Sequence, residues 1–304
     1  MINVARQSQG DIKRRIKSVK SIEQITRAME LVSVAKLRRK RSRAVAGRPY
    51  REKLETMLAH LASLPQVRLE HELLEQREIR QVGYLVVTSD RGYAGGYNNQ
   101  VLQLAMDVIG KETHPYDLYV VGKKGYDYLH KAGLPIVAEW FDLEDDIYWD
   151  TARHIADVFM DAYVTRHVDA IYLIYSEFVS SIVHRPVVKP LLPVEALKEL
   201  TVASASSTDQ ADAQEHVLPD YIWEPSPEAV LGILLPRYVE TLVYGALSEA
   251  QASEYGARMV AMQAATDNAQ QMIADLSLSY NQARQASITR EITEVIAGAG
   301  QENE

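Results

Sequence analysis

Cysteine is absent from the 304-residue sequence. The chain therefore has no disulfide, no thiolate metal ligand and no thiol switch, as is usual for a protein of a reducing compartment. We find no run of about 18 or more apolar residues, the length that a spanning helix needs, so we expect no direct membrane insertion. The N-terminus, MINVARQSQGDIKRR, lacks the apolar core of a signal peptide and does not resemble a transit peptide.

Catalytic and metal-binding patterns are also missing. No two of the eight histidines are four residues apart and no His-Glu-x-x-His occurs, so a zinc site has little support. The acidic run DLEDD (142–146) could attract a cation, but a surface loop is the commoner outcome. No nucleophile, base and orienting acid can be assembled from the sequence. We therefore expect no catalytic residue, no metal and no cofactor.

A glycine-rich stretch, SDRGYAGGYN (89–98), follows a predicted strand and precedes a predicted helix. A phosphate-binding loop would occupy this place in an α/β protein. The stretch is neither Gly-x-Gly-x-x-Gly nor a loop that ends in Gly-Lys-Ser/Thr. A tight strand-to-helix turn is therefore the favoured interpretation.

Charge is distributed unevenly along the chain. Residues 1–60 hold 16 Lys and Arg against 5 Asp and Glu, a formal charge of +11, and the net charge of −8 leaves −19 for the remainder. Such a basic segment on an acidic protein indicates an acidic partner. The run AKLRRKRSR (35–43) could bind nucleic-acid phosphates. Without interleaved aromatics, a solvated face or contact with acidic protein loops is at least as plausible, and we expect no nucleic acid as partner.

A long helix is predicted at the N-terminus. Between Asp11 and about Leu61 only Gly47 and Pro49 interrupt helix-forming residues, and apolar residues recur in steps of three and four. These apolar residues are Ile12, Ile16, Val19, Ile22, Ile25, Met29 and Val32. The spacing is close to that of a coiled coil and predicts a coiled-coil helix over residues 1–61.

A second long helix is predicted within residues 220–304. Ser226 suits the N-cap and Pro227 the first helical position, and helix-forming residues then run to about Ala297. Pro236 should bend the helix or remove one hydrogen bond near its start. We expect the helix to continue beyond it.

Between the two ends, β-rich runs alternate with helical ones. The β-rich runs are QVGYLVVTSD (81–90), DLYVVG (117–122), DAIYLIYS (169–176) and SSIVHRPVV (180–188), and the helical ones are 99–110, 123–132 and 151–166. The alternation predicts a Rossmann-like α/β domain over 62–200 with a mainly parallel sheet. The last two strands are too close in sequence for a crossover and should pair antiparallel. The small, polar stretch 201–216 predicts a flexible loop over 201–219.

Terminal helices that bracket a domain can pair antiparallel, but these two differ in length. At about 1.5 Å per residue, the first is roughly 70 Å long and the second roughly 105 Å. The excess lies at the C-terminal end, where Ile288, Ile292, Val295 and Ile296 form an apolar stripe. An exposed stripe of this kind is expected to be buried in another protein. A self-dimerising coiled coil is the alternative.

Three stretches carry a family resemblance. They are IKRRIKSVKSIEQITRAMELVSVAKLRR (12–39), TSDRGYAGGYN (88–98) and the C-terminal stretch that opens with ASEYGARMVAMQAATDNA (252–269) and closes with YNQARQASITREITEVIAGA (280–299). Together they resemble the gamma subunit of F-type ATP synthases, in the same order and over essentially the whole chain. The resemblance implies that the terminal helices form a central rotor shaft inside a ring of alternating alpha and beta subunits. It also implies that the α/β domain lies outside the ring, near the epsilon subunit and the membrane ring of c subunits.

The function that the resemblance implies is mechanical. The family couples proton-driven rotation to catalytic sites on beta and has no catalytic residue of its own. A shaft must be slim, so alanines in the C-terminal helix would let two backbones approach closely: Ala246, Ala250, Ala257, Ala261 and Ala264. Met259, Met262 and Met272 suit a surface that changes partners, because methionine repacks easily. The other interpretation, which is compatible with this one, is that these residues form coiled-coil core.

Contacts with beta and alpha are implied at matching positions. Polar residues that would meet beta are Arg258, Arg284, Gln285, Thr289 and Glu291, and we add Ile292 and Ile296 of the apolar stripe. Met29 matches a shaft position that is sensitive for coupling, near an acidic loop of beta. The basic run Lys36 to Arg43 would serve the same electrostatic neighbourhood.

The stretch DYIWEP matches the family's contact with the c ring and epsilon, through Tyr221, Trp223 and Glu224. Trp223 stands where tyrosine is frequent. Photosynthetic members carry an inserted segment, in the chloroplast type with a redox cysteine pair, whereas this chain has no cysteine. The resemblance therefore implies a bacterial protein at the cytoplasmic face of the plasma membrane. The rival hypotheses are a nucleotide-using α/β enzyme flanked by helices and a coiled-coil nucleic-acid binder.

Overall fold

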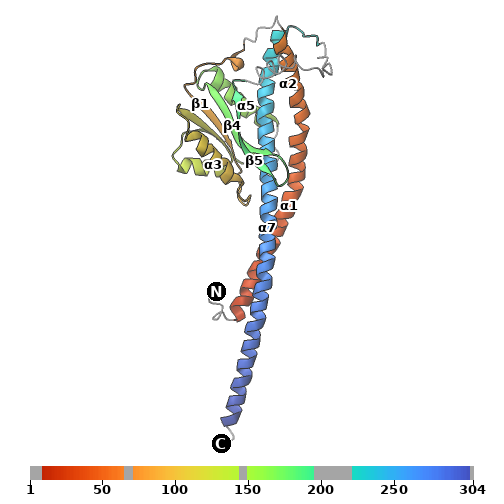
Figure 1. The fold of residues 1–304 in the computed structure, drawn as a ribbon, viewed down its shortest axis with the longest axis vertical. Helices are drawn as coiled ribbons and strands as arrows, with labels where there is room; N and C mark the ends of the chain where they lie inside the picture. The colour runs from red at the N-terminus through yellow and green to blue at the C-terminus, as the bar shows by residue number, and fades with distance from the viewer. Residues whose placement is uncertain (1–8, 65–70, 144–148, 195–220, 302–304) are drawn as a thin grey trace, which may run out of the picture. The chain divides into compact units, whose positions relative to one another are not determined.

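The computed structural model describes residues 9–64, 71–143, 149–194 and 221–301 (Figure 1). The chain divides into two compact units, a smaller one of Met1–Val34 with Arg258–Glu304 and a larger one of Ala35–Ala257. Two long helices, α1 (Gln9–Ala46) and α7 (Pro227–Gln301), contribute residues to both units.

The larger unit is built on a five-stranded sheet. Its strands are β1 (Val82–Val87), β2 (Tyr116–Val121), β3 (Ile136–Trp140), β4 (Ala170–Phe178) and β5 (His184–Leu192). They lie in the order β3-β2-β1-β4-β5, with the first four parallel and β5 antiparallel to β4. The predicted Rossmann-like α/β domain with a mainly parallel sheet and a final antiparallel pair is confirmed.

Helices cover both faces of this sheet. On one face, α3 (Tyr97–Ile109) and α4 (Lys123–Lys131) pack against side chains such as Tyr84 and Val86. On the other, α5 (Trp149–Val164), α2 (Arg48–Ser63) and the first part of α7 pack against Leu85 and Val87. Consecutive residues of β1 therefore enter different cores, as the alternation of a strand requires. A short 3-10 helix, η1 (Glu72–Leu74), precedes β1.

The predicted N-terminal helix is interrupted once. It ends at Ala46 and resumes as α2 at Arg48, so Gly47 separates two helices where the sequence predicted one. Pro49 lies in the first turn of α2, where its missing amide hydrogen costs least. Helix α2 then buries Leu54, Leu58 and Leu61 in the core of the larger unit.

The predicted start of the C-terminal helix is confirmed. Helix α7 begins at Pro227, and the amide of Ala229 donates a hydrogen bond to Ser226 Oγ over 3.3 Å. Pro236 lies inside the helix, which continues past it. The loop predicted over 201–219 falls outside the described residues.

The apolar composition of α7 differs from the expectation that no segment is long and apolar enough to span a membrane. Within the described residues, α7 is the single helix that is long and apolar enough to cross a membrane by composition, with a window of mean hydropathy 1.3. Half of that window is buried inside the protein. A core helix passes the same test, and the packing of α7 against the sheet accounts for its apolar character.

Candidate functional site

In the smaller unit, α1 and α7 pair in antiparallel orientation (Figure 1). Thr266 Oγ1 lies 2.9 Å from Thr26 Oγ1, and Gln270 Nε2 donates a hydrogen bond to Glu23 Oε1 over 3.0 Å. Both threonines are buried. Going from Thr26 to Glu23 on α1 therefore corresponds to going from Thr266 to Gln270 on α7, as antiparallel pairing requires.

The apolar stripe predicted on α1 does not stay on the paired face. Ile12 is buried, whereas Ile22, Ile25 and Val32 are exposed. Buried positions farther along α1 are instead polar, at Thr26 and Ser33. After Val19 the apolar residues are displaced by one position in the sequence, so they lie on a neighbouring row of the helix surface. The face of α1 that packs against α7 then carries the buried polar residues Thr26 and Ser33, a polar seam. The helix therefore presents a second, unburied apolar row.

The excess length of α7 is present as predicted. Extending the register of the two polar pairs places Gln9, the first described residue of α1, opposite about residue 284 of α7. Helix α7 continues to Gln301. Along this extension Ile288, Ile292, Val295 and Ile296 are all exposed, Val295 to 71%. Within the described residues, the smaller unit therefore ends in one helix with an open apolar stripe.

The polar seam yields a prediction about local stability. Thr266→Val and Thr26→Val should each weaken helix pairing by about 1 kcal/mol, because each leaves one buried hydroxyl without this partner. The double variant should cost less than the sum of the two single ones. Native-state hydrogen exchange of amides in residues 258–275 would measure these losses. Thr293→Val is the matched control, since its exposed hydroxyl contacts only the Thr289 carbonyl among the described hydrogen bonds. Strictly additive losses would contradict the coupling.

The polar residues expected to meet beta are mostly on the surface. Arg284, Gln285, Thr289 and Glu291 are all exposed on the extension of α7. Met29 is partly buried beside the seam. Arg258 differs from the others, because it is only 7% exposed and is enclosed by this chain itself.

The alanines of α7 have a different environment from the one expected. Ala246 and Ala250 lie in the core that covers the sheet, and Ala257 packs with Ala94 and Tyr97. Ala264 is exposed. Small residues in this half of α7 therefore let the helix approach the α/β domain, since the helix lies on the sheet there. The expectation that all five bring two shaft helices together is wrong for Ala264, which is exposed, and it leaves out the α/β domain, against which Ala246, Ala250 and Ala257 pack.

The basic run 35–43 is only partly solvated. The ammonium groups of Lys36 and Lys40 lie 5.5 and 5.9 Å from the ring centroid of Tyr255, and Lys40 is buried. Arg38, Arg39 and Arg41 are exposed. Since two of its cations are directed to α7, the run offers fewer charges to a nucleic acid than its sequence suggests.

The glycine-rich stretch 89–98 forms a turn, as favoured. Tyr93 and Gly95 have positive φ angles of 63° and 57°. Its polar groups bond to the chain itself: the Ser89 amide donates to Asn98 Oδ1 over 3.0 Å, and the Lys123 amide donates to Asp90 Oδ1 over 2.8 Å. Tyr97 Oη donates to the Ala250 carbonyl of α7 over 3.2 Å. Tyr97, the first residue of α3, thus bonds the end of this stretch to α7.

Tyr221 and Trp223 of the stretch DYIWEP lie beside a histidine that the sequence did not indicate. The His60 ring on α2 lies 5.3 Å from the ring of Tyr221 and 5.9 Å from that of Trp223. The two aromatic rings are 5.2 Å apart. Ile222, between them, is 88% exposed, and Glu224 is also exposed. His60 was missed because no local pattern links α2 with a segment 160 residues later.

No cluster of metal ligands is found among the described residues. Asp142 is exposed, and part of the acidic run 142–146 falls outside the described residues. The described surfaces that stand out are therefore the second apolar row of α1, the extension of α7 and the aromatic group around His60.

Comparison with known proteins gives a consistent result. The family model described as ATP synthase matches residues 8–300. The ATP synthase gamma chain of Desulfitobacterium hafniense is 43% identical over 289 residues, which is 95% of this chain and 97% of that protein. The ATP synthase gamma chain of Brevibacillus brevis is 42% identical over 292 residues, with 95% and 96% covered.

Solved structures show the same fold. A chain from the Euglena gracilis mitochondrial ATP synthase, in a structure of OSCP, F1 and c ring, matches with a TM-score of 0.67 and 19% identity over 95% of this chain and 92% of that one. A chain from a structure of the rotor of the same enzyme matches with a TM-score of 0.62 and 18% identity over 91% and 97%. An α/β domain with long terminal helices is therefore shared with these chains.

Proposed function

The chain belongs to the ATP synthase gamma chain family, and on that premise we propose that it is the central-stalk rotor subunit of an F-type ATP synthase. It couples proton-driven rotation of the c ring to conformational changes at catalytic sites on beta. The two relatives described above are both ATP synthase gamma chains. This chain aligns with 97% and 96% of their lengths. The observation that carries the proposal is the exposed apolar stripe on the end of α7 that extends beyond the described part of α1.

This stripe fits an enclosed shaft end. Ile288, Ile292 and Ile296 recur in steps of four along one side of a single helix and are all exposed. Burying such side chains contributes about 1.5–3 kcal/mol each, so an enclosing partner would stabilise the end substantially. The second apolar row of α1, at Ile22, Ile25 and Val32, supports the same proposal from the other helix.

Rotation acts on the catalytic sites through asymmetry. The two helices present different side chains at every angle, so three identical beta subunits around them would each meet a different surface. A contact shifts a conformational equilibrium only by the difference in its energy between the two conformations. Moving a site from 1:99 to 99:1 requires about 5.5 kcal/mol, which several weak contacts supply together.

The proposed contacts with beta and alpha use the exposed end of α7 and one position on α1. They are Met29, Arg284, Gln285, Thr289, Glu291, Ile292 and Ile296, and Arg258 joins them only if its enclosing contacts open. The aromatic group of Tyr221 and Trp223, with exposed Ile222 and Glu224 beside it, is the proposed contact with the c ring and epsilon.

The proposed subunit is not itself an enzyme. Two groups of the glycine-rich turn bond within the chain, the Ser89 amide to Asn98 and the Asp90 carboxylate to the Lys123 amide, which supports a structural role for this turn. The subunit acts at the cytoplasmic face of a bacterial plasma membrane as a peripheral part of the complex. Copurification of alpha and beta with this chain tests the assembly, and a chain that purifies alone from cells expressing all subunits would refute it.

Replacing Met29 tests the coupling role. Met29→Lys adds a charge beside moving charged groups, so ATP-driven proton pumping should fall about fivefold or more relative to ATP hydrolysis, a coupling change of roughly 1 kcal/mol or more. Proton pumping and hydrolysis are measured on the same inverted vesicles. Met29→Gln, which has a similar length and no charge, should keep the ratio. Equal losses of pumping and hydrolysis in Met29→Lys would contradict the role.

A further inference from the structure

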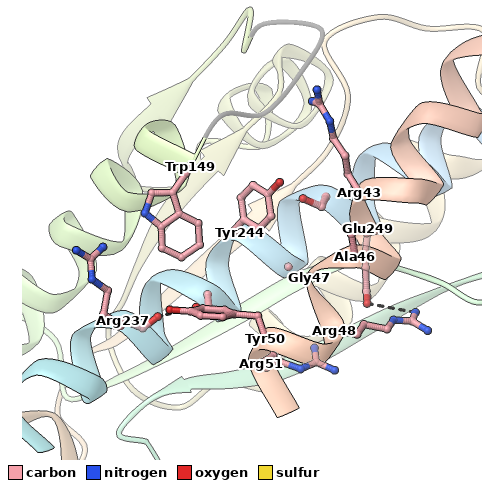
Figure 2. Close-up of a pocket in the computed structure, with 14 residues that line it drawn as sticks. Arg43, Ala46, Gly47, Arg48, Tyr50, Arg51, Trp149, Arg237, Tyr244 and Glu249 are labelled. Carbon is pink, nitrogen blue, oxygen red and sulfur yellow. Dashed lines mark hydrogen bonds and ion pairs between the residues drawn. The ribbon is translucent and has the colours of Figure 1, made fainter. Parts of the chain in front are cut away.

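A cavity of about 490 Å³ lies in the larger unit, where the end of α1 and the start of α2 meet α5 and α7 (Figure 2). Its volume falls within the range of small-molecule sites. Of the positions linked above to a partner, only Arg43, the last residue of the basic run, lines it. Its lining combines guanidinium groups, aromatic rings and small residues.

Positive charge dominates among the described residues of the lining. Four of these are arginines, Arg43, Arg48, Arg51 and Arg237, and one is a carboxylate, Glu249. Glu249 is 5% exposed and its Oε1 is 3.6 Å from Arg48 Nη2.

Arg237 and Arg51 have donors left for an anion. Arg237 Nη1 donates to Glu240 Oε2 over 2.8 Å, which uses one of its five N–H groups. Arg51 Nε is 3.6 Å from Glu55 Oε1, and within the described part of the chain this buried nitrogen has no hydrogen-bond partner. The remaining N–H donors of Arg237 and Arg51 suit the oxygens of a phosphate.

Aromatic rings lie between the arginines. The rings of Trp149 and Tyr244 are 5.5 Å apart and inclined at 51°. Figure 2 shows them with Tyr50 between Arg237 on one side and the arginines of α1 and α2 on the other. Flat aromatic faces beside guanidinium groups suit a ligand that has both a planar ring and a negative charge.

Gly245 of α7 leaves space open in the cavity. Gly245 lies inside α7 and lines the cavity, and a Cβ built on it would meet no atom within 4 Å. Alanine is more favourable than glycine in a helix interior, so packing within this chain does not explain the choice. A side chain here would enter the cavity, which is the space that a ligand needs.

We propose that this cavity binds a nucleotide, with its phosphates on Arg51 and Arg237 and its base against Trp149 and Tyr244. A simple anion would leave the aromatic faces unused, and a neutral aromatic would leave the guanidinium groups unused. The bound phosphates connect the start of α2 with α7 through Arg51 and Arg237. The site is a binding site without chemistry, and it does not depend on the rotor function.

Titration of the purified full-length chain tests the proposal. ADP should bind saturably in isothermal calorimetry and change the fluorescence of Trp149, whereas adenosine and pyrophosphate should each bind at least about tenfold more weakly, as the loss of one charge-assisted contact or one stacked ring implies. Trp149→Phe should remove most of the fluorescence change. Absence of saturable ADP binding at millimolar concentration would overturn the proposal. Equally tight binding of pyrophosphate or adenosine would overturn the assignment to a nucleotide.

Two variants locate the binding. Gly245→Leu fills the cavity and should abolish ADP binding, while Gly232→Leu, on the same helix with equally open space but outside the cavity, should leave it unchanged. Arg51→Gln should weaken ADP binding about tenfold. If Gly245→Leu lowers the melting temperature of the chain, Arg51→Gln alone decides. Unchanged affinity in Arg51→Gln, or in a folded Gly245→Leu, would refute the site.

Discussion

Replacing Gly122 with alanine should destabilise the larger unit by about 3 kcal/mol or more, the scale of strain combined with overpacking. Gly122 joins β2 to α4 with a φ of +94°, and a Cβ there would lie 2.3 Å from the Thr88 carbonyl oxygen. Thr88 has little freedom to move, since its Oγ1 donates to the Val121 carbonyl and accepts from the Gly125 amide. The substitution therefore forces apart the carboxyl ends of two central strands.

Gly133 provides the matched control for this substitution. It also has a positive φ, +72°, but a Cβ there would meet nothing within 4 Å. Gly133→Ala should therefore cost only the conformational penalty of about 1–2 kcal/mol. Denaturant unfolding of both full-length variants, followed by tryptophan fluorescence, measures the difference. Similar losses would mean that the contact with Thr88 relaxes without cost.

Removal of the Asp169 carboxylate should cost about 3–5 kcal/mol, the usual penalty for leaving a buried charge unpaired. Asp169 Oδ1 accepts from Arg77 Nε over 2.6 Å, and Oδ2 accepts from the amides of Arg80 and Gln81 over 2.9 and 3.1 Å. The two side chains of the ion pair are 13% and 10% exposed. Arg77 Nη2 also donates to the Tyr163 and Val168 carbonyls, so Asp169→Ala leaves a guanidinium that cannot withdraw to water.

A nearby surface pair is the control for this prediction. Arg166 Nη2 and Glu75 Oε1 are 3.4 Å apart, with side chains 68% and 46% exposed. Glu75→Ala should change the free energy of unfolding by less than about 1 kcal/mol, as is usual for exposed pairs. Chemical denaturation of the two variants at pH 7 compares them. A small effect of Asp169→Ala would show that water reaches Arg77.

The same carboxylate predicts a pH dependence. Burial raises the pKa of Asp169, but hydrogen bonds from the Arg80 and Gln81 amides and the contact with Arg77 outweigh it and hold this pKa below its ordinary range. A lowered pKa in the folded state means that stabilisation is complete above about pH 4 and is lost as the pH falls below it. The difference in unfolding free energy between Asp169→Ala and the unmodified chain should therefore shrink from pH 5 toward pH 2.

The regular elements of the domain were predictable because their patterns are local. Each central strand is a short β-rich run between helical stretches, and Ser226 with Pro227 marks the start of α7 by capping chemistry alone. Strand β3 was missed. It lies at the edge of the sheet with Val137 and Glu139 exposed, so its sequence lacks the continuous apolar run of the buried strands.

The partner surfaces were predictable only in part. The exposed stripe from Ile288 to Ile296 follows from the unequal helix lengths, which the sequence contains. Which row of α1 is buried depends on the side of the helix that α7 covers. The sequence of α1 alone does not reveal that side. The enclosure of Arg258 and the cavity at Gly245 are produced by segments far apart in the chain, so no local pattern could indicate them.

Mechanical stiffness changes where the described part of α1 ends and α7 continues beyond it. Two helices joined by hydrogen-bonded side chains resist torsion together, whereas one helix resists it only through its own backbone. Under an applied torque, elastic twist therefore concentrates in the last turns of α7. The end of α7 would therefore store elastic energy while it is twisted and release that energy between rotation steps.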